Sequence, residues 1–166
     1  MNLALRWRPF AVAFAICLAV AIVGSTLTEL GPWYRGLRQP AWKPPDAAFG
    51  VIWSAIFFFA ALSGSLAWSA ALDTIRRRWV LTLFLVNAAL NLLWSWLYFA
   101  QRRPDWAMVE YGFLWISVLS LVVGLWRTSR LAAVLNLPYL VWVSTAGLLN
   151  WAAVVLNGPF GQSSRG

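Results

Sequence analysis

Five long apolar runs alternate with short polar segments along the chain. A helix that crosses a bilayer needs about 20 mainly apolar residues, because each residue advances about 1.5 Å through a hydrocarbon core about 30 Å thick. The pattern therefore predicts five transmembrane helices, over residues 9–27, 47–72, 79–100, 106–126 and 131–157. The predicted fold class is all-α: an integral membrane bundle of five transmembrane helices that forms one domain over residues 1–166.

The polar segments between the runs differ in length. The last three, 73–78, 101–105 and 127–130, are so short that consecutive helices are expected to be antiparallel neighbours. The first, residues 28–46, is long and rich in proline and aromatic residues. A long loop on an otherwise minimal bundle indicates a function, and we expect it to cover a pocket. The segment 158–166 predicts a disordered tail.

The composition excludes a water-soluble globule. Hydrophobic residues make up 61% of the chain and charged residues 11%, whereas a soluble domain is about half apolar and about a quarter charged. The net charge of +8 comes from short Lys and Arg clusters between the apolar runs. Such clusters are typical of loops that face lipid headgroups. We therefore expect the lipid bilayer as a partner and no nucleic acid.

Reactive side chains are scarce. The chain has no histidine, and its single cysteine, Cys17, lies inside the first apolar run. This composition excludes the usual zinc, haem and iron–sulfur ligand sets, and every catalytic triad with a histidine base. We predict no catalytic residue, no metal site and no required cofactor.

The orientation in the membrane stays open. With alternating helices, seven basic residues fall on one side of the membrane and six on the other. The positive-inside rule needs an asymmetry that this distribution does not provide. Arg6 and Arg8 before the first run also fit a secretory signal, although the run is long enough to span. We expect an integral, multi-pass protein, with a bacterial cell membrane as the first guess for its location.

Ten of the thirteen tryptophans divide into two groups by position, and the other three are Trp33 and Trp42 in the long loop and Trp151 in the last part of the fifth run. Those at the ends of apolar runs fit the aromatic belt of membrane proteins, and they are Trp7, Trp68, Trp79, Trp106 and Trp126. A second group lies inside the runs and contains Trp53, Trp94, Trp96, Trp115 and Trp142. An indole N–H within a hydrocarbon layer requires an acceptor or a cavity. The second group therefore indicates polar contacts inside the bundle.

Helical spacing puts amides and aromatic rings on common helix faces. One face of the third run carries Asn87, Asn91, Trp94 and Tyr98, and one face of the fifth carries Tyr139, Trp142, Ala146 and Asn150. Helix direction places much of both stripes, with Trp53, beneath the long loop or near the middle of the membrane. One interpretation is an aromatic cavity for a large planar ligand. The alternative is that the amides only join neighbouring helices.

Three segments carry a family resemblance. They are GPWYRGLRQPAWKPP (residues 31–45), NLLWSWLYF (91–99) and LPYLVWVSTAGLLNW (137–151). With Trp53, their order and spacing resemble the translocator-protein family, also called tryptophan-rich sensory proteins or peripheral benzodiazepine receptors. The resemblance implies a five-helix bundle, commonly a homodimer, that binds a tetrapyrrole (a porphyrin or haem-type ring) under the first loop. Carried over by motif, the ligand-binding residues are Trp33, Trp42, Trp53, Asn91, Trp94, Trp142, Ala146 and Asn150.

The chain departs from the family pattern at several positions. Phe57 stands where the family often has Tyr, Asn87 where Gln is common, and Trp96 where Pro is often found. Eukaryotic members carry a proposed cholesterol motif in which Tyr is followed closely by a basic residue. Here Trp151 takes the place of that Tyr, and the next basic residue is Arg165. Cholesterol binding is therefore not expected.

Three functions fit the sequence to different degrees. The leading one is a receptor, sensor or carrier for tetrapyrroles, which needs no catalytic residue. The resemblance also implies an alternative, a photo-oxidative enzyme that degrades porphyrin through the ligand and tryptophan. A small-molecule exporter driven by protons is the weakest, because it needs a buried ionisable group. Glu29 and Glu110 lie near helix ends, and Glu110 is expected to reach water or Arg102 and Arg103.

Two further features leave alternatives open. Ala60 and Gly64 in the second run have the spacing of a helix–helix contact, which fits a dimer or packing inside one bundle. Arg35, Arg38 and Lys43 in the long loop fit contact with porphyrin propionates or with lipid headgroups. The homodimer is therefore expected mainly from the resemblance.

Overall fold

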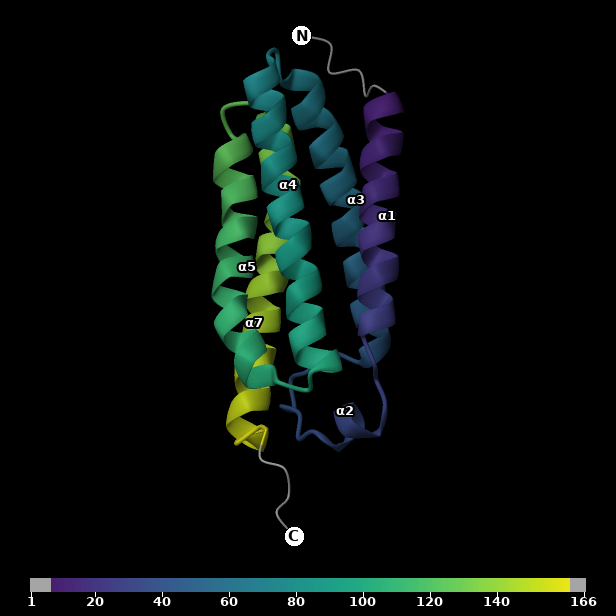
Figure 1. Ribbon diagram of the computed structural model, residues 1–166, viewed down its shortest axis with the longest axis vertical. Helices are drawn as coiled ribbons and strands as arrows, with labels where there is room; N and C mark the ends of the chain where they lie inside the picture. Colours follow the sequence, from purple (N-terminus) through teal and green to yellow (C-terminus); the bar gives the residue numbers. More distant parts are fainter. Residues whose placement is uncertain (1–6, 162–166) are drawn as a thin grey trace.

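The computed structural model describes residues 7–161, and over this range five helices are long and apolar enough to cross a membrane. Figure 1 shows them side by side along the long axis of the molecule. The long helices are α1 (Trp7–Leu27), α3 (Asp46–Ala70), α4 (Thr74–Ser95), α5 (Pro104–Leu125) and α7 (Leu137–Asn157). A π-helix continues α4 and two short helices lie in the connections: η1 (Trp96–Ala100), α2 (Pro32–Gly36) and α6 (Arg130–Val134). The predicted all-α bundle of five spans is confirmed.

The third span begins earlier than the sequence predicts. Asp73 caps α4, because its carboxylate accepts a hydrogen bond from the backbone N–H of Arg76 at 2.7 Å. A cap of this kind satisfies one of the free N–H groups of the first turn, so the helix starts at Thr74 rather than at Trp79. Residues 76–78 therefore belong to the helix and not to the turn before it.

The fifth span is two helices, whereas the sequence pattern predicts one. The break lies at residues 135–136, between α6 and α7. Pro138 has no N–H to donate to the carbonyl four residues earlier, so the helical ladder is interrupted there. Asn136 fills the break, since its Nδ2 donates to Ser63 Oγ at 2.8 Å and to the Ala132 carbonyl at 2.9 Å. The bond to Ser63 ties the interruption to α3.

α1 and α5 differ in how much of their surface the bundle covers. α1 packs mainly on α3 and also on α4, and every one of its residues keeps some exposed surface. α5 packs against both α4 and α7 and buries residues along its whole length. At the lower end of Figure 1, α2 and the first loop lie where α1 ends, α3 begins and α7 ends. The helix directions are those that the short connections predict.

α5 and α7 approach each other closely at Gly147. A methyl group at this position would overlap the ring of Tyr111, which lies against the glycine. Across the same interface, Trp115 Nε1 donates to Ser144 Oγ at 2.9 Å. The position of α7 relative to α5 is therefore set by a tight contact and a hydrogen bond. Of the predicted tail, residues 158–161 follow α7 without helix, and residues 162–166 lie outside the described part of the chain.

Candidate ligand-binding site

A cavity of about 620 Å³ lies at the loop end of the bundle, and we call it the loop-side cavity. Its walls come from α1, α3, α4 and α7, and residues next to the first loop form its rim. The volume is within the range of about 300–1,000 Å³ that small-molecule pockets occupy. The lining includes Tyr34, Asp46, Phe49, Trp53, Phe57, Asn91, Trp94, Trp142 and Ala146.

The cavity brings together most of the residues that the sequence proposes. Five of the eight predicted site residues line it, namely Trp53, Asn91, Trp94, Trp142 and Ala146. They come from three helices, α3, α4 and α7, so the tertiary structure joins the separate stripes. The lining does not include Trp33, Trp42 or Asn150.

Aromatic rings hold one another in place around the cavity. Trp53 meets Tyr139 edge-on, with 5.9 Å between ring centroids, and stacks on Phe57 at 5.6 Å. Phe49 meets Trp142 edge-on at 5.3 Å. Aromatic pairs about 4.5–7 Å apart are favourable beyond the area that they bury. The walls are therefore fixed apolar surfaces, which suit a flat ligand.

Two polar side chains in the cavity differ in their hydrogen bonding. Asn91 is 5% exposed and donates from Nδ2 to Tyr139 Oη at 3.1 Å. Trp142 is 8% exposed, and its Nε1 has no acceptor within residues 7–161. Trp115, another interior tryptophan, does have an acceptor in Ser144. The Nε1 atom itself is not exposed on the cavity wall, and a buried unpaired donor costs about 1–3 kcal/mol, so a small shift of the indole that lets a ligand accept this bond would be favourable.

Asn150 is buried between α5 and α7 and not in the cavity. In the amide orientation that suits its neighbours, Nδ2 donates to the Pro104 carbonyl at 3.0 Å and the side-chain oxygen accepts from the Met108 N–H at 3.2 Å. Asn87 likewise donates to Ser117 Oγ on α5 at 2.9 Å. These two amides join helices, as the alternative interpretation proposes. Helical spacing shows which residues share a face, but not which neighbour that face meets.

The two tryptophans of the first loop lie at different depths. Trp33, in α2, packs edge-on against Tyr98 with 6.3 Å between ring centroids. Trp42 is 53% exposed and sits in a turn that the Lys43 N–H closes with the Pro40 carbonyl at 3.0 Å. Trp33 therefore supports the loop from within, whereas Trp42 faces outward.

Polar contacts tie the first loop to the start of α3 and to the end of α7. Tyr34 Oη donates to Asp46 Oδ1 at 3.1 Å, and Lys43 forms an ion pair with the same carboxylate. Farther along, the Arg38 N–H donates to Asn157 Oδ1 at 2.7 Å, and Asn157 Nδ2 donates to the Arg38 carbonyl at 2.9 Å. Burial raises the pKa of Tyr34 and the Asp46 carboxylate raises it further, so the phenol stays protonated and keeps donating.

Tyr34 and Asp46 line the cavity although sequence reasoning does not select them. Asp46 is the first residue of α3, where the helix dipole favours a carboxylate. A stabilising role at the start of the helix therefore accounts for this residue without any role in a site. Tyr34 directly follows Trp33, and the site residues predicted in this segment are its tryptophans. The sequence does contain a signal for this part of the rim. Lys43 and Asp46 have opposite charges and flank two prolines, at the point where the loop meets the helix.

The sequence model of the TspO/MBR family matches residues 13–156. The chain belongs to this family. Protein CrtK of Rhodobacter capsulatus is 31% identical over 148 residues, which cover 89% of this chain and 92% of that protein. Tryptophan-rich protein TspO of Chlorobaculum tepidum is 32% identical over 149 residues, which cover 89% of this chain and 94% of that protein.

The similarity extends to animal relatives. The translocator protein of Homo sapiens is 31% identical over 121 residues, which cover 72% of this chain and 71% of that protein. Family membership and the five apolar helices together make the chain an integral, multi-pass membrane protein. The resemblance seen in the three sequence motifs is thereby confirmed.

At the end of α4 this TspO/MBR member forms a π-helix where the family pattern often has a proline. The Gln101 N–H donates to the Trp96 carbonyl, five residues earlier, at 2.9 Å. Before and within this turn, Trp94 and Tyr98 stack with 5.1 Å between ring centroids, and Phe99 lies 4.8 Å from Tyr98. Single π-helical turns are frequent at functional sites. The turn places this aromatic cluster at the rim of the loop-side cavity, which Trp94 and Phe99 both line.

The prediction that Glu110 reaches water or Arg102 and Arg103 is wrong. Glu110 is 6% exposed, and neither carboxylate oxygen has a hydrogen-bond partner within residues 7–161. Arg103 pairs with Asp105 instead, through Nε at 2.8 Å and through a second bond from Nη2. Glu110 lies on the buried face of α5, on which every third or fourth residue is covered. Within the described residues, no group of three or more His, Cys, Asp or Glu side chains is placed to hold a metal ion.

Proposed function

We propose that this family member is a membrane receptor or carrier that binds a tetrapyrrole, such as a porphyrin or haem-type ring, in the loop-side cavity. The observation that carries the proposal is the aromatic wall of this cavity, which includes Trp142, a residue whose buried indole N–H has no acceptor in the described residues. A tetrapyrrole is planar and mainly apolar, and its ring nitrogens and carboxylates accept hydrogen bonds. It therefore matches both the walls and the free donor.

Lys43, next to two of the lining rings, carries a positive charge that the carboxylates of such a ligand could meet. Lys43 Nζ lies 5.5 Å from the ring centroid of Tyr34 and 5.7 Å from that of Phe49, and both rings line the cavity. Lys43 is paired with Asp46 in this structure. A ligand carboxylate would compete with Asp46 for the ammonium group, which links ligand binding to the contacts of the first loop.

The names of relatives support a sensory role. A relative from Cereibacter sphaeroides, 29% identical over 151 residues, is named tryptophan-rich sensory protein. We take sensing, rather than catalysis, as the proposed role, because the cavity offers aromatic walls and one amide, Asn91. The expected homodimer stays a prediction, since Gly64 of the small-residue pair packs inside this chain, near Phe84 and Ala13.

A titration with protoporphyrin IX tests the proposal. Trp142→Phe keeps an aromatic ring and removes the N–H, and Trp115→Phe is the matched control, because its N–H is already bonded to Ser144. Loss of one hydrogen bond to the ligand should weaken binding about threefold to tenfold in Trp142→Phe, with little change in the control. Binding that is measured by the porphyrin absorbance shift and is equal in both variants would overturn the proposal.

A further inference from the structure

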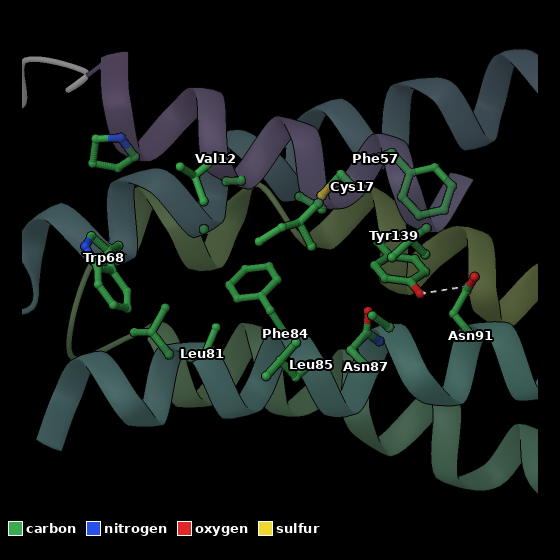
Figure 2. Close-up of a pocket in the computed structure, with 18 of the residues that line it drawn as sticks. Val12, Cys17, Phe57, Trp68, Leu81, Phe84, Leu85, Asn87, Asn91 and Tyr139 are labelled. Atoms are coloured by element: carbon green, nitrogen blue, oxygen red, sulfur yellow. Dashed lines mark hydrogen bonds between the residues drawn. The ribbon is translucent and has the colours of Figure 1, made fainter. Parts of the chain in front are cut away.

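A second cavity, of about 390 Å³, lies in the half of the bundle away from the first loop, and we call it the distal groove. Figure 2 shows α1 along one side of it and α4 along the other. α3 contributes a further wall. The side chains that define it include Val12, Cys17, Phe57, Trp68, Phe84 and Leu85.

The length of the distal groove matches one leaflet of a bilayer. On α1 its lining extends from Arg8 to Val20, which corresponds to roughly 18 Å at about 1.5 Å per residue. One leaflet of the hydrocarbon core is about 15 Å deep, because the whole core is about 30 Å thick. A single acyl chain that runs along α1 would therefore be covered over most of its length.

Small side chains on α1 and α3 make room for the groove. Ala13, Ala60 and Gly64 line it, and a Cβ added at Gly64 would lie 3.6 Å from the ring of Phe84. α1 packs on the bundle without burying any of its own residues fully. The groove therefore exists because two helices meet through small residues at their contact.

The inner end of the groove is lined by polar side chains that already form hydrogen bonds with one another or with neighbouring residues. Asn91 donates to Tyr139 at 3.1 Å, and Asn87 donates to Ser117 at 2.9 Å. Both amides and Tyr139 line the groove, and none of them carries a charge. Figure 2 shows the bond between Asn91 and Tyr139 at the inner end. A ligand that reaches this depth needs no charged group there.

The charge is at the opposite end of the groove. Arg8 lines the groove together with Trp68, and the guanidinium of Arg77 lies 5.5 Å from the centroid of the Trp68 ring. Within residues 7–161, neither Arg8 nor Arg77 forms an ion pair, and the nearby Asp73 is paired with Arg76 at 3.3 Å. Arg8 thus stands at the mouth of the groove, and Arg77 lies beside it at Trp68, with its Nε donating to the Ala71 carbonyl at 3.3 Å. Neither arginine has a carboxylate partner in that range.

We propose that the distal groove binds one acyl chain of an anionic phospholipid, with the phosphate at Arg8 and Arg77. The apolar lining takes the chain, and the two guanidinium groups take the negative headgroup. The charge at the mouth selects an anionic lipid over a zwitterionic one. This site shares Phe57 and Asn91 with the loop-side cavity but opens at the other end of the bundle, and the proposal does not depend on the tetrapyrrole site.

Native mass spectrometry of the purified protein measures the selectivity. The probes are phosphatidylglycerol and phosphatidylcholine with identical acyl chains. We expect the wild-type protein to retain phosphatidylglycerol preferentially, and Arg8→Gln and Arg77→Gln each to weaken this binding about fivefold. Arg130→Gln is the matched control, because Arg130 also lies over an interface tryptophan, Trp126, at 5.9 Å, but lines no part of the groove.

A photoreactive group on the acyl chain locates the bound lipid. Phosphatidylglycerol with a diazirine in its chain should label peptides of α1 and α3 that line the groove, and Ala60→Phe should remove that labelling by filling the space. Ala89→Phe, on an exposed face of α4, is its control. Equal retention of both lipids, an equal effect of Arg130→Gln, or labelling that Ala60→Phe leaves unchanged would each overturn the proposal.

Discussion

The loop-side cavity and the distal groove share Phe57 and Asn91 but differ in where their unsatisfied polar groups lie. The loop-side cavity has an unpaired N–H deep inside, on Trp142, and a rim whose Lys43 is already paired. The distal groove has satisfied amides at its inner end and arginines without carboxylate partners in residues 7–161 at its mouth. A buried free donor indicates a ligand with an internal acceptor, whereas charge at the mouth alone indicates an amphiphile.

The largest effect is expected at the α5–α7 contact, which positions one wall of the loop-side cavity. Gly147→Ala should destabilise the protein by about 1–3 kcal/mol, because the new methyl group overlaps the Tyr111 ring. It should also weaken porphyrin binding, since α7 carries Trp142 and Ala146, while retention of lipid in the distal groove changes little. Thermal unfolding and the two binding measurements check this.

Gly112→Ala is the matched control for the glycine on α7. A Cβ at Gly112 would meet no atom within 4 Å, so this variant should be more stable by about 0.5–1 kcal/mol. If Gly147→Ala is as stable as the control, α5 and α7 do not meet as the structure shows. If both binding measurements fall together, the two sites are not independent.

Glu110 tests whether every unpaired polar group marks a ligand site. Its carboxylate is buried without a partner in residues 7–161, and it lines neither the loop-side cavity nor the distal groove. Glu110→Met should therefore raise the free energy of unfolding by about 1–2 kcal/mol, because an apolar side chain of similar length replaces an unsatisfied polar group. Porphyrin affinity should stay the same. A large loss of affinity would extend the functional site to α5.

The hydrogen bond from Tyr34 to Asp46 allows a test of whether the first loop slows the release of a bound ligand. Tyr34→Phe should speed porphyrin dissociation about threefold to tenfold, because about 0.5–1.5 kcal/mol of loop contact is lost. Since burial raises the pKa of Tyr34, the phenol's contribution is present below about pH 10 and is lost as the pH rises through the raised value. Stopped-flow dissociation from pH 7 to pH 10 should show a constant ratio between wild type and variant. A ratio that disappears by pH 8 would contradict this assignment.

The smallest change in porphyrin affinity is expected for a substitution of Trp42. Its side chain is 53% exposed and lines neither the loop-side cavity nor the distal groove, so Trp42→Ala should change porphyrin affinity by no more than about twofold. The same titration measures it. A tenfold loss would mean that the loop rearranges on binding to bring this indole into the cavity.

Much of the fold and part of the candidate site follow from the sequence for identifiable reasons. The length of the apolar runs predicts the five spans, and helical spacing groups Asn91, Trp94 and Trp142, which all line the loop-side cavity. Glu110 is placed wrongly, because distance from a helix end does not say which face of the helix is buried. Asn150 belongs to a real stripe, but its neighbour is the backbone of α5.

By itself, the sequence determined that the chain crosses a membrane five times and belongs to the TspO/MBR family, because hydropathy and motif spacing are properties of the chain alone. Only the tertiary structure decided which polar groups are satisfied. Trp115 and Trp142 look alike in the sequence, yet Ser144 accepts a hydrogen bond from one of them and no described residue does so for the other. Hydrogen bonds between helices depend on how those helices rotate and pack, and no local pattern records that.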